Sequence, residues 1–97
     1  MEIITRVQEQ KPLETREWRK DDGEVVVIKS VQLQLKSGTD VIMCEANDKL
    51  AERIAANPLD VNYLYVANLS FSPRKGKDKN GNEMFFQKIK LSEINYL

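Results

Sequence analysis

The sequence predicts an all-β protein, a five-stranded Greek-key barrel with one short helix between the third and fourth strands. Segments rich in β-branched and aromatic residues recur along the chain, which is typical of strands. The spacing of apolar residues becomes helical only once, over residues 48–56. Asp-Gly, Ser-Gly and Asn-Gly pairs fall between the apolar segments, where they favour turns. Because the chain has 97 residues, we expect a single domain, residues 1–97.

The first half of the chain predicts three strands. Residues 2–8 favour a first strand, and residues 14–20 can continue it as far as an Asp-Gly turn. Residues 24–36 form the longest predicted strand, and their pattern allows a bulge near Lys29–Ser30. A Ser-Gly turn then leads to the third strand, residues 40–46.

Residues 48–56 predict the one helix. Asn47 or Asp48 can cap its N-terminus, and an apolar stripe that includes Leu50 and Ile54 recurs at helical spacing. We expect this stripe to cover a core rather than to bind a ligand. An Asn-Pro pair then ends the helix, because the residue before a proline is disfavoured in helical conformation.

The rest of the chain predicts a hairpin with a basic loop. Residues 61–72 favour the fourth strand, and Pro73 is expected to stop it because proline has no N–H to donate to the ladder. Residues 74–81 are then a loop in which Gly76 and an Asn-Gly pair turn the chain back. Residues 82–97 alternate in character and form the last strand.

The last predicted strand has two different faces. The face expected to cover the core consists of Phe85, Ile89 and Leu91. The opposite face consists of Phe86, Lys88 and Lys90. An aromatic ring beside ammonium groups suits a surface that stacks unpaired bases and meets phosphates. Lysines on a last strand can also protect a sheet edge, but the four cations in the neighbouring loop favour nucleic-acid binding.

The only tryptophan, Trp18, lies among charged residues rather than in an apolar pattern. Its ring can pack over the end of a barrel or stack on a base, and its cationic neighbours favour stacking. Both hairpins therefore contribute to a candidate nucleic-acid surface. Its residues are Arg16, Trp18, Arg19, Lys20, Phe71, Arg74, Lys75, Lys77, Lys79, Phe86, Lys88 and Lys90.

The charge of the chain is balanced but unevenly distributed. Fifteen basic and fifteen acidic residues give a net charge of zero, which argues against a uniformly basic nucleic-acid binder. Residues 73–97 nevertheless carry six cations and three anions, against nine and twelve in residues 1–72. A local positive patch attracts phosphate over about 8–10 Å. We therefore expect moderate, salt-sensitive binding.

Other features restrict the chemistry. No histidine is present, which excludes a histidine-based catalytic dyad, and we expect no metal site and no cofactor. The single Cys44 has no cysteine with which to pair. No apolar run is long enough to span a membrane, and the N-terminus lacks a signal pattern. We therefore expect a cytoplasmic protein that does not bind membranes.

The predicted order, three strands, a helix and two strands, is that of the OB-fold, whose central strands and protruding loops bind oligonucleotides. The layout also resembles the small single-stranded DNA-binding proteins of bacteria and phages and their relative, primosomal replication protein N. The features that carry the resemblance are Glu2-Ile3-Ile4, the hairpin around Trp18 and Gly23, the helix, the Asn80-Gly81 turn, Phe85-Phe86 and Ile89-x-Leu91.

The resemblance covers nearly the whole chain by layout and implies binding of single-stranded nucleic acid. The bacterial proteins of this kind usually continue into a disordered tail with an acidic tip. Here the sequence ends at Leu97 with only Glu93 nearby. The resemblance is therefore closer to the members without a tail, and recruitment of partners through a tail is not expected.

Sequence-tolerant binding of single-stranded DNA is the function that we expect, in replication, recombination or the DNA metabolism of phages and mobile elements. RNA is the alternative ligand, although the dense aromatic-Gly-aromatic motifs of cold-shock proteins are missing. The alternative function is a protein-interaction module that would use Tyr63, Tyr65, Met84 and Phe86. An enzyme is not expected. A homodimer or higher homo-oligomer is expected because residues 61–72 carry apolar side chains on both faces.

Overall fold

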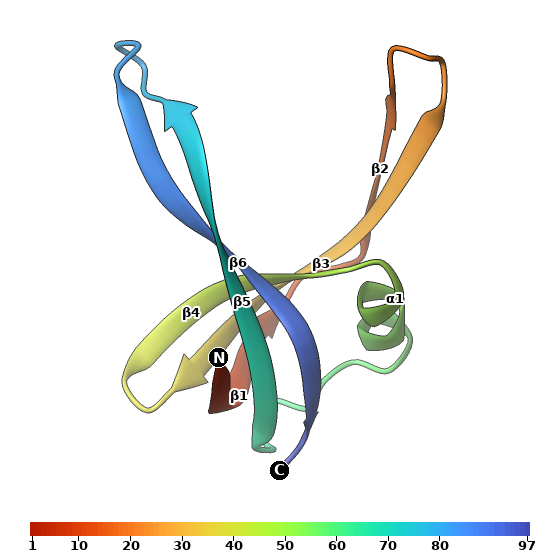
Figure 1. Cartoon of the computed structure of the whole chain (residues 1–97). Coiled ribbons are helices and arrows are strands. Elements are labelled where there is room, and N and C mark those ends of the chain that lie inside the picture. Colours follow the sequence, from red (N-terminus) through yellow and green to blue (C-terminus); the bar gives the residue numbers. More distant parts are fainter.

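The computed structural model describes residues 1–97 and shows a mostly β protein with a single helix (Figure 1). The elements in chain order are β1 (Glu2–Gln10), β2 (Glu14–Arg19), β3 (Val25–Ser37), β4 (Asp40–Asn47), α1 (Asp48–Ala56), β5 (Tyr65–Lys77) and β6 (Glu83–Tyr96). The predicted class, with one short helix before the last two strands, is confirmed. The predicted bounds of the helix are also confirmed.

The strands form one sheet that closes into a ring. Neighbouring strands follow the order β1-β5-β6-β4-β3, and β3 pairs back with β1. These pairings are antiparallel, except that β4 and β6 run parallel and pair only at Glu45 and Lys90. The β4–β6 pairing that closes the ring is therefore the shortest of its strand pairings.

The predicted first strand is divided into two strands that share one partner. β1 pairs with residues 33–36 of β3, and β2 pairs with residues 25–30. Pro12 lies between β1 and β2, where its missing N–H interrupts the ladder. The chain thus has six strands, although β1 and β2 together run along β3 as the single predicted strand would.

The bulge predicted at Lys29–Ser30 is wrong, because β3 pairs with both neighbours without a shift there. The register shifts lie in β1 between Val7 and Glu9 and in the β5–β6 pair between Asn68 and Leu69. An extra residue in one strand increases the local twist and bends the sheet. These two positions therefore help the sheet to curl into a ring.

The core fills the ring. Thirteen buried apolar side chains come from α1 and from every strand of the ring. Leu33, Leu69 and Leu91 are each 1% exposed. Burying a leucine side chain contributes roughly 2 kcal/mol to the stability of the fold, so each of these residues holds its strand against the core. Tyr65 is 1% exposed, and its hydroxyl accepts a hydrogen bond of 2.8 Å from the N–H of Asp60. The prediction of Tyr65 as an outward-facing interaction residue is therefore wrong.

The helix α1 closes one side of the ring, as its apolar stripe predicted. Ala51 and Ile54 are buried, and Leu50 packs against the core. Asn47 occupies the N-cap position, as predicted, but its side chain makes no capping hydrogen bond. Its Oδ1 is buried without a partner.

β5 begins and ends later than predicted. It starts at Tyr65 and continues through Pro73, so the prediction that this proline stops the strand is wrong. β1 pairs with β5 only as far as Asn68, and beyond that point β6 is its sole neighbour. A proline whose nitrogen faces the open edge removes no ladder bond. The predicted loop 74–81 is consequently reduced to a turn at residues 78–82.

Two β-hairpins extend beyond the ring and diverge from it (Figure 1). The first, here called arm 1, consists of residues 14–29 in β2 and the start of β3. The second, arm 2, consists of residues 70–90 in the end of β5 and the start of β6. No residue of either arm is buried. The arms therefore add little to the core and leave their side chains available for contacts.

Candidate nucleic-acid interface

One face of the sheet runs from arm 1 across the ring to arm 2. In β4, Cys44 and Ala46 are buried, so Met43 and Glu45 point outward. Gln32 of β3 lies opposite Glu45 and points the same way. The same alternation along the paired strands extends this outer face onto both arms. Its arm residues are Arg16, Trp18, Val26, Ile28, Arg74, Met84, Phe86, Lys88 and Lys90.

The structure brings half of the predicted site residues to this outer face. These are Arg16, Trp18, Arg74, Phe86, Lys88 and Lys90. The predicted residues that lie on the opposite face of the arms are Arg19, Phe71, Lys75 and Lys77. The two that lie at the turns are Lys20 and Lys79. The predicted set therefore surrounds the arms rather than forming one flat patch.

A glycine on the opposite strand positions the ring of Phe86. Phe86 lies opposite Arg74, and its side chain is 51% exposed. A Cβ built on Gly76 would come within 3.3 Å of the Phe86 Cε1, so the edge of the ring rests on the Gly76 backbone. A larger residue at this position would displace the ring. Gly76 therefore supports an exposed aromatic surface of the kind on which a base can stack.

A groove of about 410 Å³ lies where arm 2 leaves the ring. The residues that line it are Gln32, Met43, Cys44, Glu45, Phe86, Gln87, Lys88 and Ile89. The Nζ atom of Lys88 lies 3.6 Å from the Oε2 atom of Glu45, which joins arm 2 to β4. The groove thus combines an aromatic ring, a carboxylate, an ammonium group and amides.

The tip of arm 2 is closed by Asp78. Its Oδ1 accepts hydrogen bonds of 2.9 Å from the N–H groups of Asn80 and Asn82. The bond from Asn82 is the main reason why the pKa of the Asp78 carboxyl lies below its ordinary value. Gly81 has a φ of 82° and makes the turn, whereas the prediction that Gly76 helps to turn the chain is wrong. The Asp78 carboxylate beside Lys79 is therefore already hydrogen-bonded to backbone N–H groups.

The opposite face of arm 2 carries a second pair of aromatic and cationic side chains. The Nζ atom of Lys75 lies 5.7 Å from the centroid of the Phe85 ring. Phe85 is on the predicted face of β6, but it is 68% exposed and its assignment to the core is wrong. Arm 2 extends beyond the ring, so nothing covers Phe85. Phe71 lies nearer the ring on the same face, opposite Ile89.

On arm 1, the Trp18 side chain is 50% exposed and does not pack over the end of the ring. It lies opposite Val26 in β3. The neighbouring Arg16 forms an ion pair of 3.3 Å with Glu14, and Lys20 lies 3.8 Å from Glu24. Arm 1 therefore presents an aromatic ring whose cationic neighbours are largely compensated.

The two arms differ in charge. Arm 2 has six basic and two acidic residues, a net charge of +4. Arm 1 has four basic and five acidic residues, a net charge of −1. On arm 2 only Lys88 forms an ion pair with a carboxylate. The positive field of the molecule is therefore concentrated on arm 2, where it would attract phosphates.

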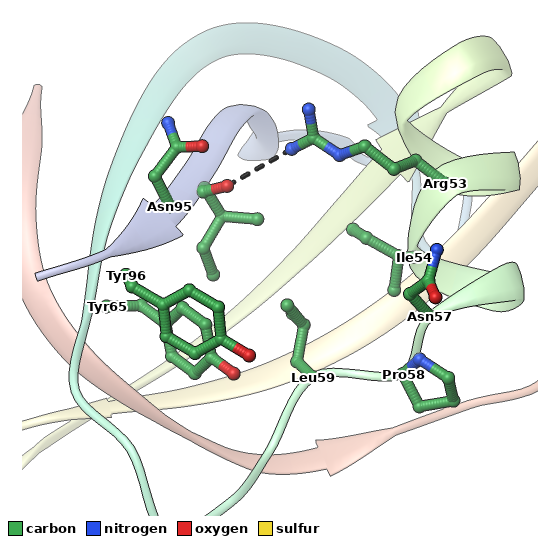
Figure 2. A pocket seen from close by; sticks show the side chains of 9 residues that line it. Arg53, Ile54, Asn57, Pro58, Leu59, Tyr65, Asn95 and Tyr96 are labelled. Atoms are coloured by element: carbon green, nitrogen blue, oxygen red, sulfur yellow. Dashed lines mark hydrogen bonds between the residues drawn. The ribbon is translucent and has the colours of Figure 1, made fainter.

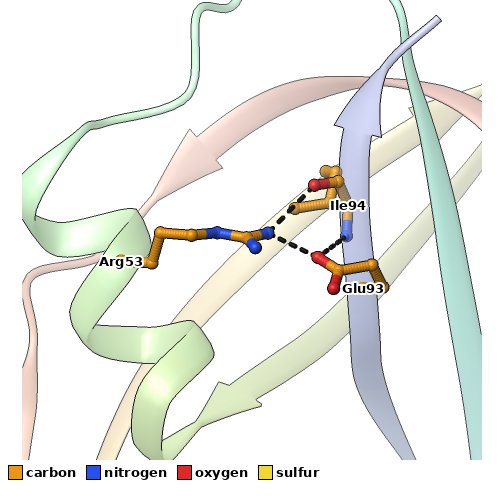
Figure 3. A network of polar contacts seen from close by, with 3 residues as sticks. All are labelled: Arg53, Glu93 and Ile94. Atoms are coloured by element: carbon orange, nitrogen blue, oxygen red, sulfur yellow. Dashed lines mark hydrogen bonds and ion pairs between the residues drawn. The ribbon is translucent and has the colours of Figure 1, made fainter.

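A second hollow, of about 340 Å³, lies between α1 and the ends of β5 and β6 that are far from arm 2 (Figure 2). Tyr65 and Tyr96 stack beside it with ring centroids 5.0 Å apart. Arg53 reaches across from α1 and donates hydrogen bonds to Glu93 (2.5 Å) and to the carbonyl of Ile94 (3.1 Å; Figure 3). The Arg53 guanidinium is therefore already hydrogen-bonded within the protein. Its bond to Glu93 holds the pKa of that carboxyl below its ordinary value.

The structure contains neither an activated thiol nor a cluster of metal ligands. Burial raises the pKa of the Cys44 thiol to about 12, so this thiol is protonated at neutral pH and is a poor nucleophile. No group of three or more His, Cys, Asp or Glu side chains comes together to hold a metal ion. The one helix is too short and too polar to cross a bilayer.

Comparison with known proteins adds no relative to this picture. No family model matches the sequence, and no curated protein is similar to it. The resemblance in layout to single-stranded DNA-binding proteins therefore stays an expectation. The functional interpretation depends on what the side chains of the arms and of the outer face can do.

Sequence reasoning missed four residues of the candidate interface. Gln32, Met43 and Glu45 line the groove, and Phe85 adds an exposed ring to arm 2. Alternation in residues 40–46 would have placed Met43 and Glu45 outward, opposite Cys44. No local sequence signal shows that β6 continues beyond the ring. The point at which a strand leaves the ring depends on how many of its residues pair with a second strand.

Proposed function

We propose that this protein binds single-stranded DNA with little dependence on sequence, through arm 2 and the adjoining outer face of the ring. The observation that carries the proposal is the chemistry of arm 2. This arm has a net charge of +4, exposes three phenylalanine rings and buries none of its residues. A hairpin that serves only to build a core would not combine these features. Cations beside exposed rings are what a single-strand surface requires.

In the proposed mechanism, the phosphates and the bases of the DNA contact different side chains. Arg74, Lys75, Lys77 and Lys79 meet phosphates and release the counterions that surround the strand. Phe86, supported by Gly76, stacks on an unpaired base, a contact worth roughly 1–3 kcal/mol. Because cations lie on both faces and at the tip of arm 2, a DNA strand can pass from one face of the arm to the other around its edge.

The topology supports an OB-type barrel as the scaffold for this function. The strands close into a ring, and α1 precedes the last two strands. In the OB-fold, the outer strand face and the loops beside it bind oligonucleotides. The groove between β4 and arm 2 lies on the outer face of the closed sheet. We propose a binding protein of this kind and not an enzyme.

The proposal is tested by titrating the protein with oligo(dT) and following the fluorescence of Trp18, the only tryptophan. A second measurement, anisotropy of a labelled oligo(dT), detects binding that does not reach arm 1. We expect saturable binding at low salt that weakens as salt is added. Parallel titrations with oligo(rU) and with duplex DNA distinguish a single-strand preference from general phosphate binding. Absence of binding in both measurements would contradict the proposed function.

One observation favours a second candidate function, protein interaction with a copy of this chain. Tyr63, Tyr96 and Leu97 are 56%, 68% and 66% exposed and lie together at the end of the ring away from arm 2. Tyr63 meets Tyr96 edge to face, with centroids 5.7 Å apart. We propose that this patch forms a homodimer. Sedimentation velocity at tens of micromolar would show a dimer, and the Tyr63→Ser variant would be a monomer.

A further inference from the structure

The groove beside arm 2 contains a feature that phosphate attraction does not explain. The residues that line it include Glu45, whose side chain is only 22% exposed. A carboxylate at this position would repel the phosphates that arm 2 attracts. Lys88 lies 3.6 Å away and compensates its charge. The groove is thus close to neutral although it lies on the most basic part of the molecule.

The groove is an open hollow on the outer face with room for a base. Its volume is about 410 Å³. The Phe86 ring forms one wall, and Met43 lines the groove beside Cys44. Polar groups that can read a base edge come from two neighbouring strands. Gln32 of β3 lies directly opposite Glu45 of β4 on the outer face.

The chemistry of Glu45 selects among bases. A carboxylate only accepts hydrogen bonds, so it pairs with an exocyclic amino group and repels a carbonyl oxygen. Cytosine presents an amino group at the 4-position, where uracil and thymine present oxygen. Uracil and thymine also carry an N3–H that a carboxylate can accept, so the selection depends on the 4-position. A base that stacks on Phe86 with its 4-position toward Glu45 would be favoured if it is cytosine and disfavoured if it is uracil or thymine.

We infer that this groove is a base-reading subsite in which Glu45 favours bases with an exocyclic amino group. The inference rests on the proposed single-strand binding and adds a preference to it. Lys88 lies 3.6 Å from this carboxylate and compensates its charge at the junction of β4 and arm 2. Binding elsewhere along the arm stays independent of sequence, since the cations there contact phosphates.

The test compares oligo(dC) with oligo(dU) of equal length at pH 7.5, by anisotropy of a 5′ label. Apart from the ring nitrogen that changes with it, these strands differ only in the group at the 4-position. We expect the unmodified protein to bind oligo(dC) about fivefold more tightly, the low end of what one base contact contributes. Equal affinities in the unmodified protein would overturn the inference while leaving the proposed function intact. Binding to neither strand would overturn both.

Three variants identify the source of the preference. Glu45→Gln replaces the carboxylate by an amide that can also donate to uracil, so the fivefold ratio should fall to about one. Glu2→Gln removes the same charge from an exposed position on β1 and should keep the ratio. Glu45→Asp keeps the charge but shortens the side chain, so the ratio should fall without a general gain in affinity. An unchanged ratio in both Glu45 variants would overturn the assignment.

Discussion

Arm 1 and arm 2 have the same architecture and different chemistry. Both are two-stranded hairpins that leave the ring (Figure 1). Neither of them has a buried residue. Arm 1 carries a net charge of −1, and its cations Arg16 and Lys20 are paired with neighbouring carboxylates. Arm 2 carries +4, and its only side-chain ion pair joins Lys88 to β4. The two arms are therefore equally free of buried residues, but only arm 2 has the net positive charge that phosphate binding would require.

The comparison also separates two uses of exposed aromatic residues. Trp18 on arm 1 lies opposite a valine, among charges that cancel. Phe86 on arm 2 rests on Gly76, lies opposite Arg74 and borders a groove. Stacking on a base gains most where cations hold the adjacent phosphates, because the backbone is then already ordered. We therefore expect Phe86 to contribute more to binding than Trp18.

The largest expected difference between the arms follows from charge reversal. Replacing Lys75, Lys77 and Lys79 by glutamate should weaken oligo(dT) binding by about 100-fold or more at low salt, because phosphates then meet like charge. The matched control replaces Arg16, Arg19 and Lys20 of arm 1 in the same way and should cost much less. Anisotropy titrations of the two triple variants make the comparison. Equal losses would show that the positive field of arm 2 has no special role.

The next difference concerns the aromatic rings. Phe86→Ala should weaken oligo(dT) binding by roughly 1–3 kcal/mol, whereas Trp18→Ala should cost less. Neither ring is buried, so the melting temperature should change little in either variant. A labelled oligonucleotide is needed here because Trp18→Ala removes the intrinsic fluorophore. A larger loss for Trp18→Ala would place the main stacking site on arm 1.

A smaller effect is expected at Gly76. In Gly76→Ala the new Cβ would lie 3.3 Å from Cε1 of Phe86, so the exposed ring must shift by a few tenths of an ångström, and oligo(dT) affinity should fall by less than about 1 kcal/mol, part of one stacking contact. Stability should not fall, because alanine has less conformational freedom than glycine in the unfolded chain. The control is Ser72→Ala, on the same face of β5 and opposite Lys88. If both variants bind alike, Gly76 does not position the ring.

The smallest effect lies in the ring and should leave both arms unchanged. Arg53 donates a hydrogen bond to Glu93 (Figure 3). This bond lowers the pKa of the Glu93 carboxyl in the folded protein. A lowered folded-state pKa stabilises the fold above the unfolded value of about 4.3, and this contribution is lost as the pH falls through the folded-state pKa. Because the pair is half exposed, Glu93→Gln should cost less than about 1 kcal/mol at pH 7.

Thermal melts of Glu93→Gln and unmodified protein at pH 7 and pH 3 check this expectation. The difference in melting temperature should shrink in acid, and oligo(dT) affinity should stay the same at neutral pH. A loss of affinity in Glu93→Gln would mean that the Arg53–Glu93 pair is coupled to the arms. A difference that grows in acid would contradict the direction of the pKa change.

The order and type of the elements could be predicted because they depend on local periodicity. The helix bounds, the alternation of β6 and the turns at Gly23 and Gly81 follow from spacing and from residues that accept positive φ. The lengths of the strands could not be predicted in this way. Pro73 continues β5 because the strand has only one neighbour there, which is a property of the sheet and not of the segment.

The candidate site was predicted in composition but not in arrangement. The cations of residues 74–79 and the face of Phe86 follow from the sequence, whereas their placement on a projecting hairpin does not. Phe85 shows the reason most clearly. Alternation gave its face correctly, but its exposure depends on where the ring ends. Glu45 joins the site only because β4 and β6 meet beside it.

The most direct test of phosphate binding by arm 2 is the salt dependence of oligo(dT) affinity in the unmodified protein. Five of the six cations of this arm have no carboxylate partner. Four of these, Arg74, Lys75, Lys77 and Lys79, are the ones that we propose to meet phosphates. Four such contacts predict a slope of about −3 for log K against log salt concentration, since each contributes about −0.7 on single strands. A slope near zero, at any measured affinity, would contradict phosphate recognition by arm 2.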